Sequence, residues 1–279
     1  MDDGSTTRHR LVVERKGDWK AMLERFSITK PMQSSLNSPP ISNAFIDRLC
    51  QFERLNAAAI HALHDLMPVS DWVESGQVIL AEGEPSPFVV PILEGLAYRY
   101  KQMRDGRRQI IGLLTPGDLS GGYGRLSQRL HYGVMAQTRV RVAKTSCEPF
   151  WTLAQREPMI GLALHRAALA DEDLLRAWII NLGQRQATAR MAHLLCELEH
   201  RMSNCGLTLN AGEFRLPLSQ QELGEVLGMS SVHINRVLQK LRAEKLITFY
   251  SRIVRIKNLE GLRAVADFDS GYLDRVDRF

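Results

Sequence analysis

Residues 231–240 combine a guanidinium, an ammonium, an amide, an imidazole and a hydroxyl at the spacing of one exposed helix face. An arginine can pair bidentately with guanine in the major groove of DNA, and an asparagine can pair in the same way with adenine. A helix that offers such side chains from its first two turns is therefore suited to reading base edges. The face that we expect to be exposed consists of Ser231, Val232, His233, Asn235, Arg236 and Lys240.

The elements that must position this face are two short helices within residues 219–241, separated by a break at Gly228. Ser219 and Glu222 have the spacing of a capping box, in which each side chain binds a backbone N–H at the start of the first helix. Ser230 is the candidate N-cap of the second helix. The apolar positions, spaced as one buried stripe on each helix, are Leu223, Val226, Leu227, Ile234, Val237, Leu238 and Leu241.

The same pattern also fits an ordinary pair of packed helices whose polar face only contacts solvent. The distribution of charge along the chain favours DNA binding over this alternative. The chain has a formal net charge of +5, which by itself only permits a nucleic-acid partner. Residues 184–257 contain eleven basic and six acidic residues, so this segment carries the entire formal excess. A basic excess around the two-helix unit is the footprint expected of a phosphate-binding surface.

Length and composition indicate a folded chain without a membrane partner. The 279 residues predict two domains, and 44% hydrophobic residues suffice for a real core. No apolar run approaches the roughly 20 residues that a membrane helix needs. The polar start of the chain, MDDGSTTRHR, lacks the apolar stretch of a secretory signal. We therefore expect a cytoplasmic protein.

Cysteine and histidine spacing predicts neither a disulfide nor a metal site. The four cysteines are dispersed without a C-x-x-C pair, and Cys196 fits a small core residue. His61 and His64 are one helical turn apart but have no third ligand nearby. The β-rich segment holds only His131, without the H-x-H pair of a metal-binding cupin. We therefore expect that the protein is not an enzyme and that it binds neither a metal nor a cofactor.

The N-terminal half changes from a polar arm to a helix and then to short β-rich runs. Residues 1–40 are expected to be a flexible arm, and residues 42–66 are expected to form one helix. Between Trp72 and Lys144, short strands alternate with glycine turns such as Asp105-Gly106. Strands at intervals of about ten residues predict an antiparallel sandwich or barrel.

Residues 158–182 predict a long helix that Gly183 ends, followed by a second helix over residues 185–202. The apolar seam of the long helix either pairs with a second chain or covers its own barrel, and we favour pairing because a helix-turn-helix usually reads DNA as a dimer. Residues 246–256 predict a hairpin, or wing, with Arg252 at its tip. The seam consists of Leu164, Ala168, Leu175, Trp178 and Leu182.

This order of elements resembles that of the Crp–Fnr superfamily of bacterial transcription regulators over residues 43–258. The stretch LPLSQQELGEVLGMSSVHINRVLQKLRAEKLI is similar to the DNA-reading module of that family. The resemblance implies an α+β fold with an antiparallel, cyclic-nucleotide-binding-like β-barrel sensor domain, a long dimerisation helix and a C-terminal winged helix-turn-helix. The glycines that resemble the turn ladder of the family's barrel are Gly76, Gly83, Gly95, Gly106 and Gly117.

The resemblance implies a homodimeric, sequence-specific DNA-binding transcription regulator, with double-stranded DNA and RNA polymerase as partners. The recognition helix is expected at about residues 230–242. The target sequence, the sign of regulation and the roles of the two ends of the chain stay open. The expected segments are an arm (1–40), a barrel domain with flanking helices (41–157), a dimerisation helix (158–183), a winged helix-turn-helix domain (184–258) and a tail (259–279).

In the family, an arginine at the place of Arg236 reads a guanine, and the residues at Ser231, Val232 and Asn235 set the remaining preference. Many relatives carry a glutamate at the place of Val232, which accepts a hydrogen bond from cytosine. Valine cannot accept one, though it can touch a thymine methyl, so the half-site stays open. The expected DNA contacts are Ser219, Gln220, Ser230, Ser231, Val232, His233, Asn235, Arg236, Lys240 and Arg252.

The barrel departs from the family pattern at the place where cyclic AMP binds. Relatives hold the phosphate with a G-E-L turn and a following Arg-Ser or Arg-Thr pair, but here the turn is Gly117-Asp118-Leu119 and the pair falls near Leu130-His131. Leu175 stands where relatives offer a threonine to the adenine, and the N-terminal cysteine cluster of iron–sulfur relatives is missing. The alternative function is a regulator gated by a cyclic nucleotide or another small molecule. Its candidate effector residues are Asp118, Arg125, Arg129, His131 and Leu175.

Overall fold

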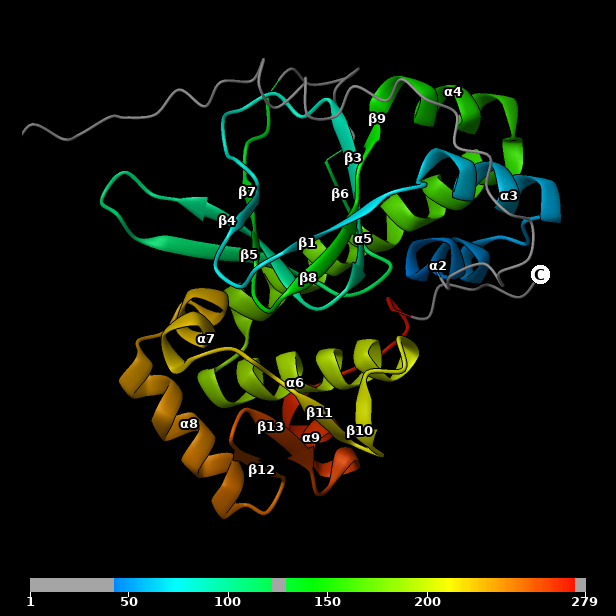
Figure 1. Ribbon diagram of the computed structural model, residues 1–279. Coiled ribbons are helices and arrows are strands. Elements are labelled where there is room, and N and C mark those ends of the chain that lie inside the picture. The colour runs from blue at the N-terminus through cyan, green and yellow to red at the C-terminus, as the bar shows by residue number, and fades with distance from the viewer. Residues whose placement is uncertain (1–42, 122–128, 274–279) are drawn as a thin grey trace, which may run out of the picture. The chain divides into compact units, whose positions relative to one another are not determined.

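Two antiparallel sheets form the barrel of the computed structural model, which describes residues 43–121 and 129–273 (Figure 1). The first sheet has the strand order β1-β8-β3-β6, with β9 paired to β3, and the second has the order β2-β7-β4-β5. Val90, Ile92 and Val134 are fully buried in the core that both sheets share. The prediction of an antiparallel barrel is thus confirmed. The strands are β1 (Ser70–Val73), β2 (Val78–Leu80), β3 (Phe88–Glu94), β4 (Ala97–Gln102), β5 (Arg108–Leu114), β6 (Leu119–Gly121), β7 (Gly133–Ala136), β8 (Val140–Ala143) and β9 (Thr145–Ser146).

The five glycines that were predicted to form turns of the barrel have the backbone conformation of such turns. All five glycines have a positive φ, between 80° and 94°, a region that residues with a Cβ rarely adopt. At Gly95 an added Cβ would lie 2.3 Å from the carbonyl oxygen of Arg139. This turn therefore needs glycine for space as well as for backbone conformation.

Two helices precede the barrel strands, α2 (Ala44–Phe52) and α3 (Ala57–Leu66). The prediction of one continuous helix over residues 42–66 is therefore wrong. The chain becomes extended at Glu53, with φ −154°. Asn56 then caps α3, because its side chain accepts the N–H of Ala59 at 2.8 Å. Asparagine is among the strongest N-cap residues, and here its local hydrogen bond prevails over the apolar periodicity that continues across the break.

The long helix α5 (Pro158–Gln184) follows α4 (Cys147–Arg156) and packs against α2, α4 and α6. It confirms the predicted helix, but Gly183 does not end it. The chain leaves the helix at Arg185, where ψ is 140°. One interior glycine costs a helix only about 1 kcal/mol relative to alanine, which the packing of a helix of 27 residues offsets.

The predicted seam of α5 divides between two faces. Leu164 and Trp178 are 7% exposed and lie in the chain's own core, so the prediction that they face a second chain is wrong. Leu175 is 42% exposed, and its neighbours Ile179 and Ile180 are 70% and 52% exposed. The most exposed apolar side chains of α5 are therefore these three residues.

The C-terminal part of the chain forms a winged helix-turn-helix around one apolar core. Its four-stranded sheet has the order β10-β11-β13-β12, so the predicted wing is confirmed and is extended by two strands that its sequence pattern did not predict. In Figure 1 these elements lie together below the barrel. They are α6 (Ala187–Asn204), β10 (Thr208–Asn210), β11 (Glu213–Arg215), α7 (Gln220–Leu227), α8 (Ser231–Ala243), β12 (Ile247–Tyr250), β13 (Ile253–Ile256) and α9 (Leu259–Ala266).

None of the four cysteines, all of which lie in the described residues, forms a disulfide, and Cys196 is buried in the core as predicted. The described residues contain no cluster of metal ligands and no helix with the length and apolarity to cross a membrane. The predicted flexible arm (1–40), Arg125 and the end of the predicted tail (274–279) lie outside the described residues. The described residues belong to one compact unit, and the predicted domain boundaries within it stay predictions.

Candidate nucleic-acid interface

The helix-turn-helix begins with the predicted capping box. The hydroxyl of Ser219 accepts the N–H of Glu222 at 3.1 Å, and the Glu222 carboxylate accepts the N–H of Ser219 at 2.8 Å. Gly228 then ends α7 in the left-handed conformation, with φ 64°. Ser230 caps α8 by accepting the N–H of His233 at 3.3 Å. These local bonds set where both helices start and how sharply the chain turns between them.

Burial divides α8 into two faces. Its apolar stripe lies in the domain core, where Ile234 and Leu241 are fully buried and Val237 and Leu238 are nearly so. The opposite face is exposed and carries Ser231, Val232, His233, Arg236 and Lys240, with Asn235 at its edge. The bases of a major groove can be reached only by side chains on such an outward face.

An open hollow of about 380 Å³ lies along the exposed face of α8. Five predicted contacts line it: Ser230, Val232, His233, Arg236 and Lys240. Asn235 points to the other helix, because its amide donates to Gln220 of α7 at 3.4 Å. The structure therefore brings most of the predicted contacts onto one surface, with Ser219 and Gln220 exposed at the start of α7.

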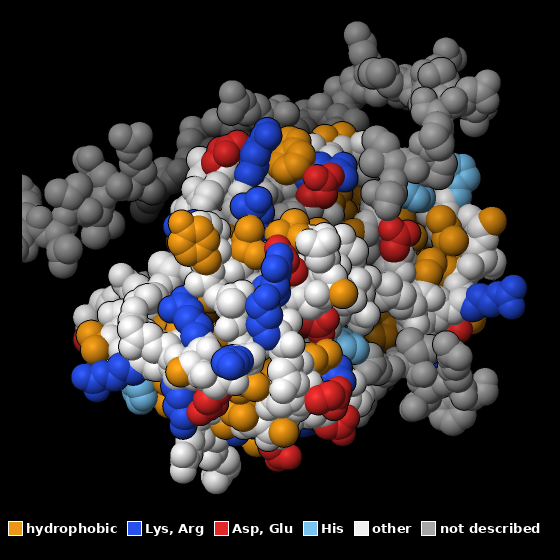
Figure 2. Space-filling view, turned by 90° about the horizontal axis from the view of Figure 1, so that it is seen from below, with side chains coloured by type: hydrophobic (Ala, Val, Ile, Leu, Met, Phe, Trp, Pro, Cys, Tyr) orange, Lys and Arg blue, Asp and Glu red, His pale blue; other side chains and the backbone are white. Residues whose placement is uncertain are grey.

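The wing carries Arg252 at its tip, as predicted. Ser251 and Arg252 form the turn and both have a positive φ, 50° and 62°, which is uncommon for residues other than glycine. Arg242 of α8 donates to the carbonyl of Phe249 at 2.6 Å and so ties the wing to the helix. Figure 2 shows Lys and Arg side chains recurring across the face on which the C-terminal elements lie.

Two residues next to this surface were not predicted from the sequence. Thr188, in the first turn of α6, lines the hollow beside α8 but is more than forty residues from it in the chain, so no local pattern connects them. Tyr250, at the end of β12, is 84% exposed. A large aromatic residue directly before the wing turn is a signal that the sequence does contain.

Comparison with known proteins agrees with this geometry. Residues 189–265 match the Crp-like helix-turn-helix domain, and residues 71–157 match the cyclic nucleotide-binding domain. The chain is 31% identical over 176 residues to the transcriptional activator protein FnrL of Cereibacter sphaeroides, a match that covers 62% of this chain and 70% of FnrL. The chain belongs to the Crp–Fnr superfamily.

This Crp–Fnr protein is a DNA-binding transcription regulator, and regulators of the family act as dimers. It is also 28% identical over 167 residues to the nitrogen fixation regulation protein FixK of Bradyrhizobium diazoefficiens, covering 60% of this chain and 69% of FixK. The solved structure of FixK2 from Bradyrhizobium japonicum has a TM-score of 0.64 and 23% identity over 71% of this chain and 96% of that chain, which supports the fold.

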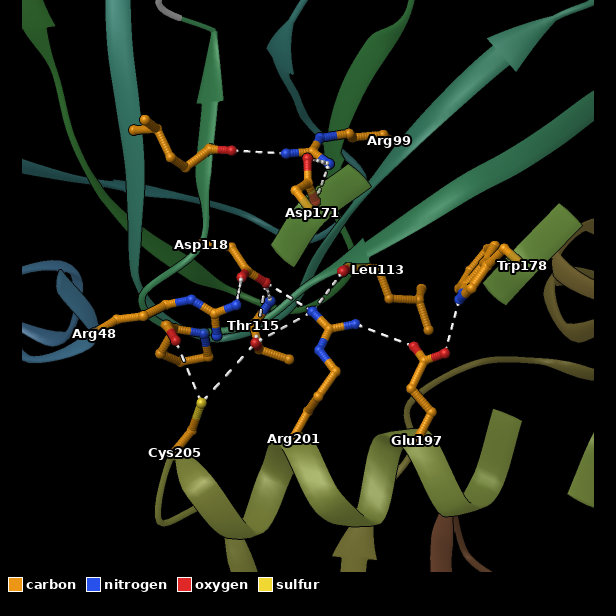
Figure 3. A network of polar contacts seen from close by, with 12 residues as sticks. Arg48, Arg99, Leu113, Thr115, Asp118, Asp171, Trp178, Glu197, Arg201 and Cys205 are labelled. Carbon is orange, nitrogen blue, oxygen red and sulfur yellow. Dashed lines mark hydrogen bonds and ion pairs between the residues drawn. The ribbon is translucent and has the colours of Figure 1, made fainter. Parts of the chain in front are cut away.

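In this Crp–Fnr regulator the acidic residue of the predicted effector turn is part of a buried polar network (Figure 3). Asp118 accepts from Arg201 of α6 and from the N–H of Thr115, at 2.8 and 2.6 Å. It also pairs with Arg48 of α2 at 3.3 Å. Burial opposes its ionisation, but both arginines hold the pKa of Asp118 below its ordinary value. Internal donors therefore already occupy the oxygens with which Asp118 would bind an effector.

The other effector candidates of this Crp–Fnr regulator lie on separate elements. Arg129 donates to the carbonyl of Gly83 at 2.8 Å. His131 is exposed, and its backbone carbonyl accepts from Lys101 at 3.0 Å. Leu175 lies on the exposed apolar face of α5. Their assignment to an effector site stays a prediction.

The cavity between the barrel and α5 measures about 120 Å³, below the roughly 300–1,000 Å³ typical of ligand pockets. Arg99 of β4 narrows it by donating to both oxygens of Asp171 on α5, at 2.9 and 2.8 Å, and to the carbonyl of Leu119 at 2.7 Å (Figure 3). Burial disfavours the charge of Arg99, but Asp171 holds its pKa above the ordinary value. A cyclic nucleotide has room here only if this pair separates.

Proposed function

We propose that this Crp–Fnr regulator binds DNA as a homodimer, with α8 of each subunit in a major groove. The division of α8 into a buried stripe and an exposed face around Arg236 carries the proposal. Two such helices in a symmetric dimer read two half-sites about one helical turn, or roughly 34 Å, apart.

Arg236 is the residue that we assign to base reading, as a bidentate donor to guanine. Val232 is 62% exposed and suits contact with a thymine methyl rather than a polar contact. Asn235 bonds to Gln220, so it reads adenine only when this weak 3.4 Å bond opens. Ser231 and His233 refine the preference from the first turn of α8.

Contacts to the DNA backbone surround this reading helix. Ser219 and Gln220 at the start of α7, Ser230, and Lys240 are exposed polar groups of the kind that bind phosphates. Arg252 extends this set to the wing tip. We add Tyr250 beside it and Thr188 beside α8, because both are placed to touch the sugar–phosphate backbone when α8 enters the groove.

The dimer face that we propose is the exposed apolar part of α5 around Leu175, Ile179 and Ile180. Such residues on one helix are the pattern of a two-helix seam. Burying them against the same residues of a second subunit is the symmetric arrangement that most homodimers use.

We propose that gating by a cyclic nucleotide is not the input of this regulator. The observations against it are the small cavity and the two internal ion pairs, Arg99–Asp171 and Asp118–Arg201. Titration calorimetry with cyclic AMP and cyclic GMP tests this proposal, and we expect no heat of binding and no change in DNA affinity. A saturable heat that disappears in Arg129→Ala would restore the ligand-gated alternative.

We further propose that the regulator works in the cytoplasm and contacts RNA polymerase. FnrL, whose name describes a transcriptional activator, supports the second point. A DNA-bound activator must meet the polymerase at the promoter, whereas a repressor need only cover it.

Selection of bound duplexes from a random DNA pool tests the proposed function most directly. We expect an inverted repeat whose half-sites contain a conserved guanine and whose centres are one helical turn apart. Enrichment of a single unrepeated site, or no enrichment at all, would show that the dimeric reading mode is wrong.

A further inference from the structure

A short segment, Asp267–Leu273, follows α9 and turns back onto α6; we call it the strap. Asp267 has left-handed backbone angles, φ 48° and ψ 55°, and so reverses the chain. The N–H of Phe268 then bonds to the carbonyl of Arg263 at 3.1 Å. The strap lies beyond residues 189–265, which match the Crp-like helix-turn-helix domain.

Two aromatic rings of the strap hold a buried histidine of α6. The ring of Tyr272 stacks on His193 with an interplanar angle of 7° and a centroid distance of 6.1 Å. Phe268 meets the same imidazole edge-on at 5.3 Å. The hydroxyl of Tyr272 also lies 3.4 Å from the carboxylate of Glu197, which is itself bound by Trp178 of α5 at 2.9 Å. The strap therefore contacts α6 and, through Glu197, α5.

Two residues with extended backbone, Arg185 and Gln186, separate α5 from α6, and we call them the hinge. Arg185 bonds to the start of the strap. Its guanidinium donates to the carbonyls of Ala266 and Asp267 at 2.9 and 3.1 Å. These carbonyls stand at the C-terminal end of α9, where a cation is also favoured by the helix dipole.

A second arginine also bonds to residues at the hinge. Arg190 of α6 donates to the carbonyls of Leu182 and Arg185, at 2.8 and 3.1 Å, and to that of Leu227 at the end of α7. Two arginines thus bond to the residues at the hinge, and Asp267 of the strap supplies one of the two carbonyls that Arg185 binds.

We propose that the strap is a positioning segment, with Phe268 and Tyr272 as its anchors, which restrains the Arg185–Gln186 hinge and so fixes the orientation of the DNA-binding domain on α5. The proposal rests on the proposed function only for its effect on DNA. A dimer binds both half-sites at once only if its two recognition helices keep the spacing of one helical turn. Freedom at the hinge lowers the effective concentration of the second helix at its half-site.

Two truncated variants distinguish the effect of removing the strap from the effect of removing residues 274–279. One ends after Asp267, which removes both rings but keeps the carbonyls that Arg185 binds. The matched control ends after Leu273 and removes only residues 274–279. A full-length Phe268→Ala/Tyr272→Ala double variant repeats the test if the first truncation does not fold, and Tyr272→Phe keeps the stacking while removing the hydroxyl.

Hydrogen exchange read by mass spectrometry measures the restraint without DNA. In the chain that ends after Asp267, we expect peptides over residues 180–194 to exchange about tenfold faster than in the control, because local opening becomes easier. Peptides from the barrel strands should not change, which distinguishes a freed hinge from global destabilisation. Equal exchange at the hinge in both truncated chains, or faster exchange everywhere, would overturn the proposal.

DNA-binding titrations test whether the restraint of the hinge affects simultaneous binding to two half-sites. On a duplex with two half-sites we expect the affinity of the strapless chain to fall about tenfold, and on a single half-site we expect a change of less than about twofold. Equal losses on both duplexes would show that the strap acts on the reading helix itself and not on the hinge. If the full-length chain binds neither duplex, the proposed function fails, while hydrogen exchange still decides the role of the strap.

Discussion

The guanidinium of Arg201 lies 2.8 Å from the carboxylate of Asp118 and joins α6 to the turn between β5 and β6. Arg201 also pairs with Glu197 at 3.3 Å and donates to the carbonyl of Leu113 at 2.8 Å. The Arg201 and Asp118 side chains are only 6% and 11% exposed. Because both side chains are largely shielded from water, loss of either partner leaves the other charge with weaker compensation, and the pair therefore couples α6 to the barrel.

We expect Arg201→Met to lower the free energy of unfolding by about 3–5 kcal/mol, because it leaves Asp118 buried with a weaker set of partners. Arg201→Met/Asp118→Leu should cost less than the sum of the two single changes, since no unpaired charge remains. Arg48→Met is the matched control, because Arg48 is more exposed and pairs with Asp118 at the longer distance of 3.3 Å. Urea unfolding compares these two variants, Asp118→Leu and Arg48→Met with the parent protein, and strict additivity of the two single changes would refute the coupling.

Arg236→Ala should remove about 1–3 kcal/mol of preference for the selected site over random DNA. Lys240→Ala is the control, since loss of a phosphate contact should weaken binding to every sequence and reduce the salt slope by about one. Fluorescence polarisation titrations on both duplexes at several salt concentrations separate the two effects. Unchanged selectivity in Arg236→Ala would show that the base-reading residue has been misassigned.

Tyr250→Ala should weaken DNA binding about three- to tenfold on all sequences, because backbone contacts carry little sequence information. Tyr250→Phe tells which part of the side chain matters, as it keeps the ring and removes the hydroxyl. The same polarisation assay applies, with circular dichroism to confirm that the wing variants stay folded. If Tyr250→Ala binds as well as the parent protein, the wing tip does not approach DNA.

Ile179→Glu should weaken self-association at least about thirtyfold, since a central interface residue is often worth 2 kcal/mol or more. Val78→Glu is the comparison, because Val78 is a similarly exposed apolar residue, at 49%, on a barrel strand. Light scattering coupled to gel filtration over a dilution series reports the mass. A dimer that survives Ile179→Glu but not Val78→Glu would move the interface from α5 to the barrel.

His193 should make the free energy of unfolding depend on pH between about 4 and 6.5. Burial, and to a lesser degree Arg185, lowers the pKa of His193 from 6.5 to about 4. Below pH 6.5 the unfolded chain therefore binds a proton that the folded chain does not, and stability falls as the pH falls. The full effect of this shift is about 3 kcal/mol. Urea unfolding at several pH values should show a shallower slope in His193→Leu than in the parent protein, and equal slopes would contradict this assignment.

Local signals in the chain predicted the parts of the fold that local bonds determine. The capping box at Ser219, the break at Gly228 and the ladder of glycine turns each depend on backbone geometry within a few residues, so their residue types suffice. Two helix boundaries were predicted wrongly. The Asn56 cap and the continuation of α5 through Gly183 depend on small local energies, which the periodicity of apolar residues does not reflect.

The candidate DNA-reading residues were determined by the sequence alone, because α8 has one apolar stripe and only its opposite face can remain exposed. Tertiary structure decided the partners of Asp118, Trp178 and Thr188. Asp118 binds Arg201, Trp178 binds Glu197, and Thr188 lies beside α8. The members of each pair are distant in the chain, so no spacing rule connects them. Whether a polar or aromatic residue is free to bind an external group depends on which distant side chain already fills its hydrogen-bonding and packing needs, and only the folded chain settles that.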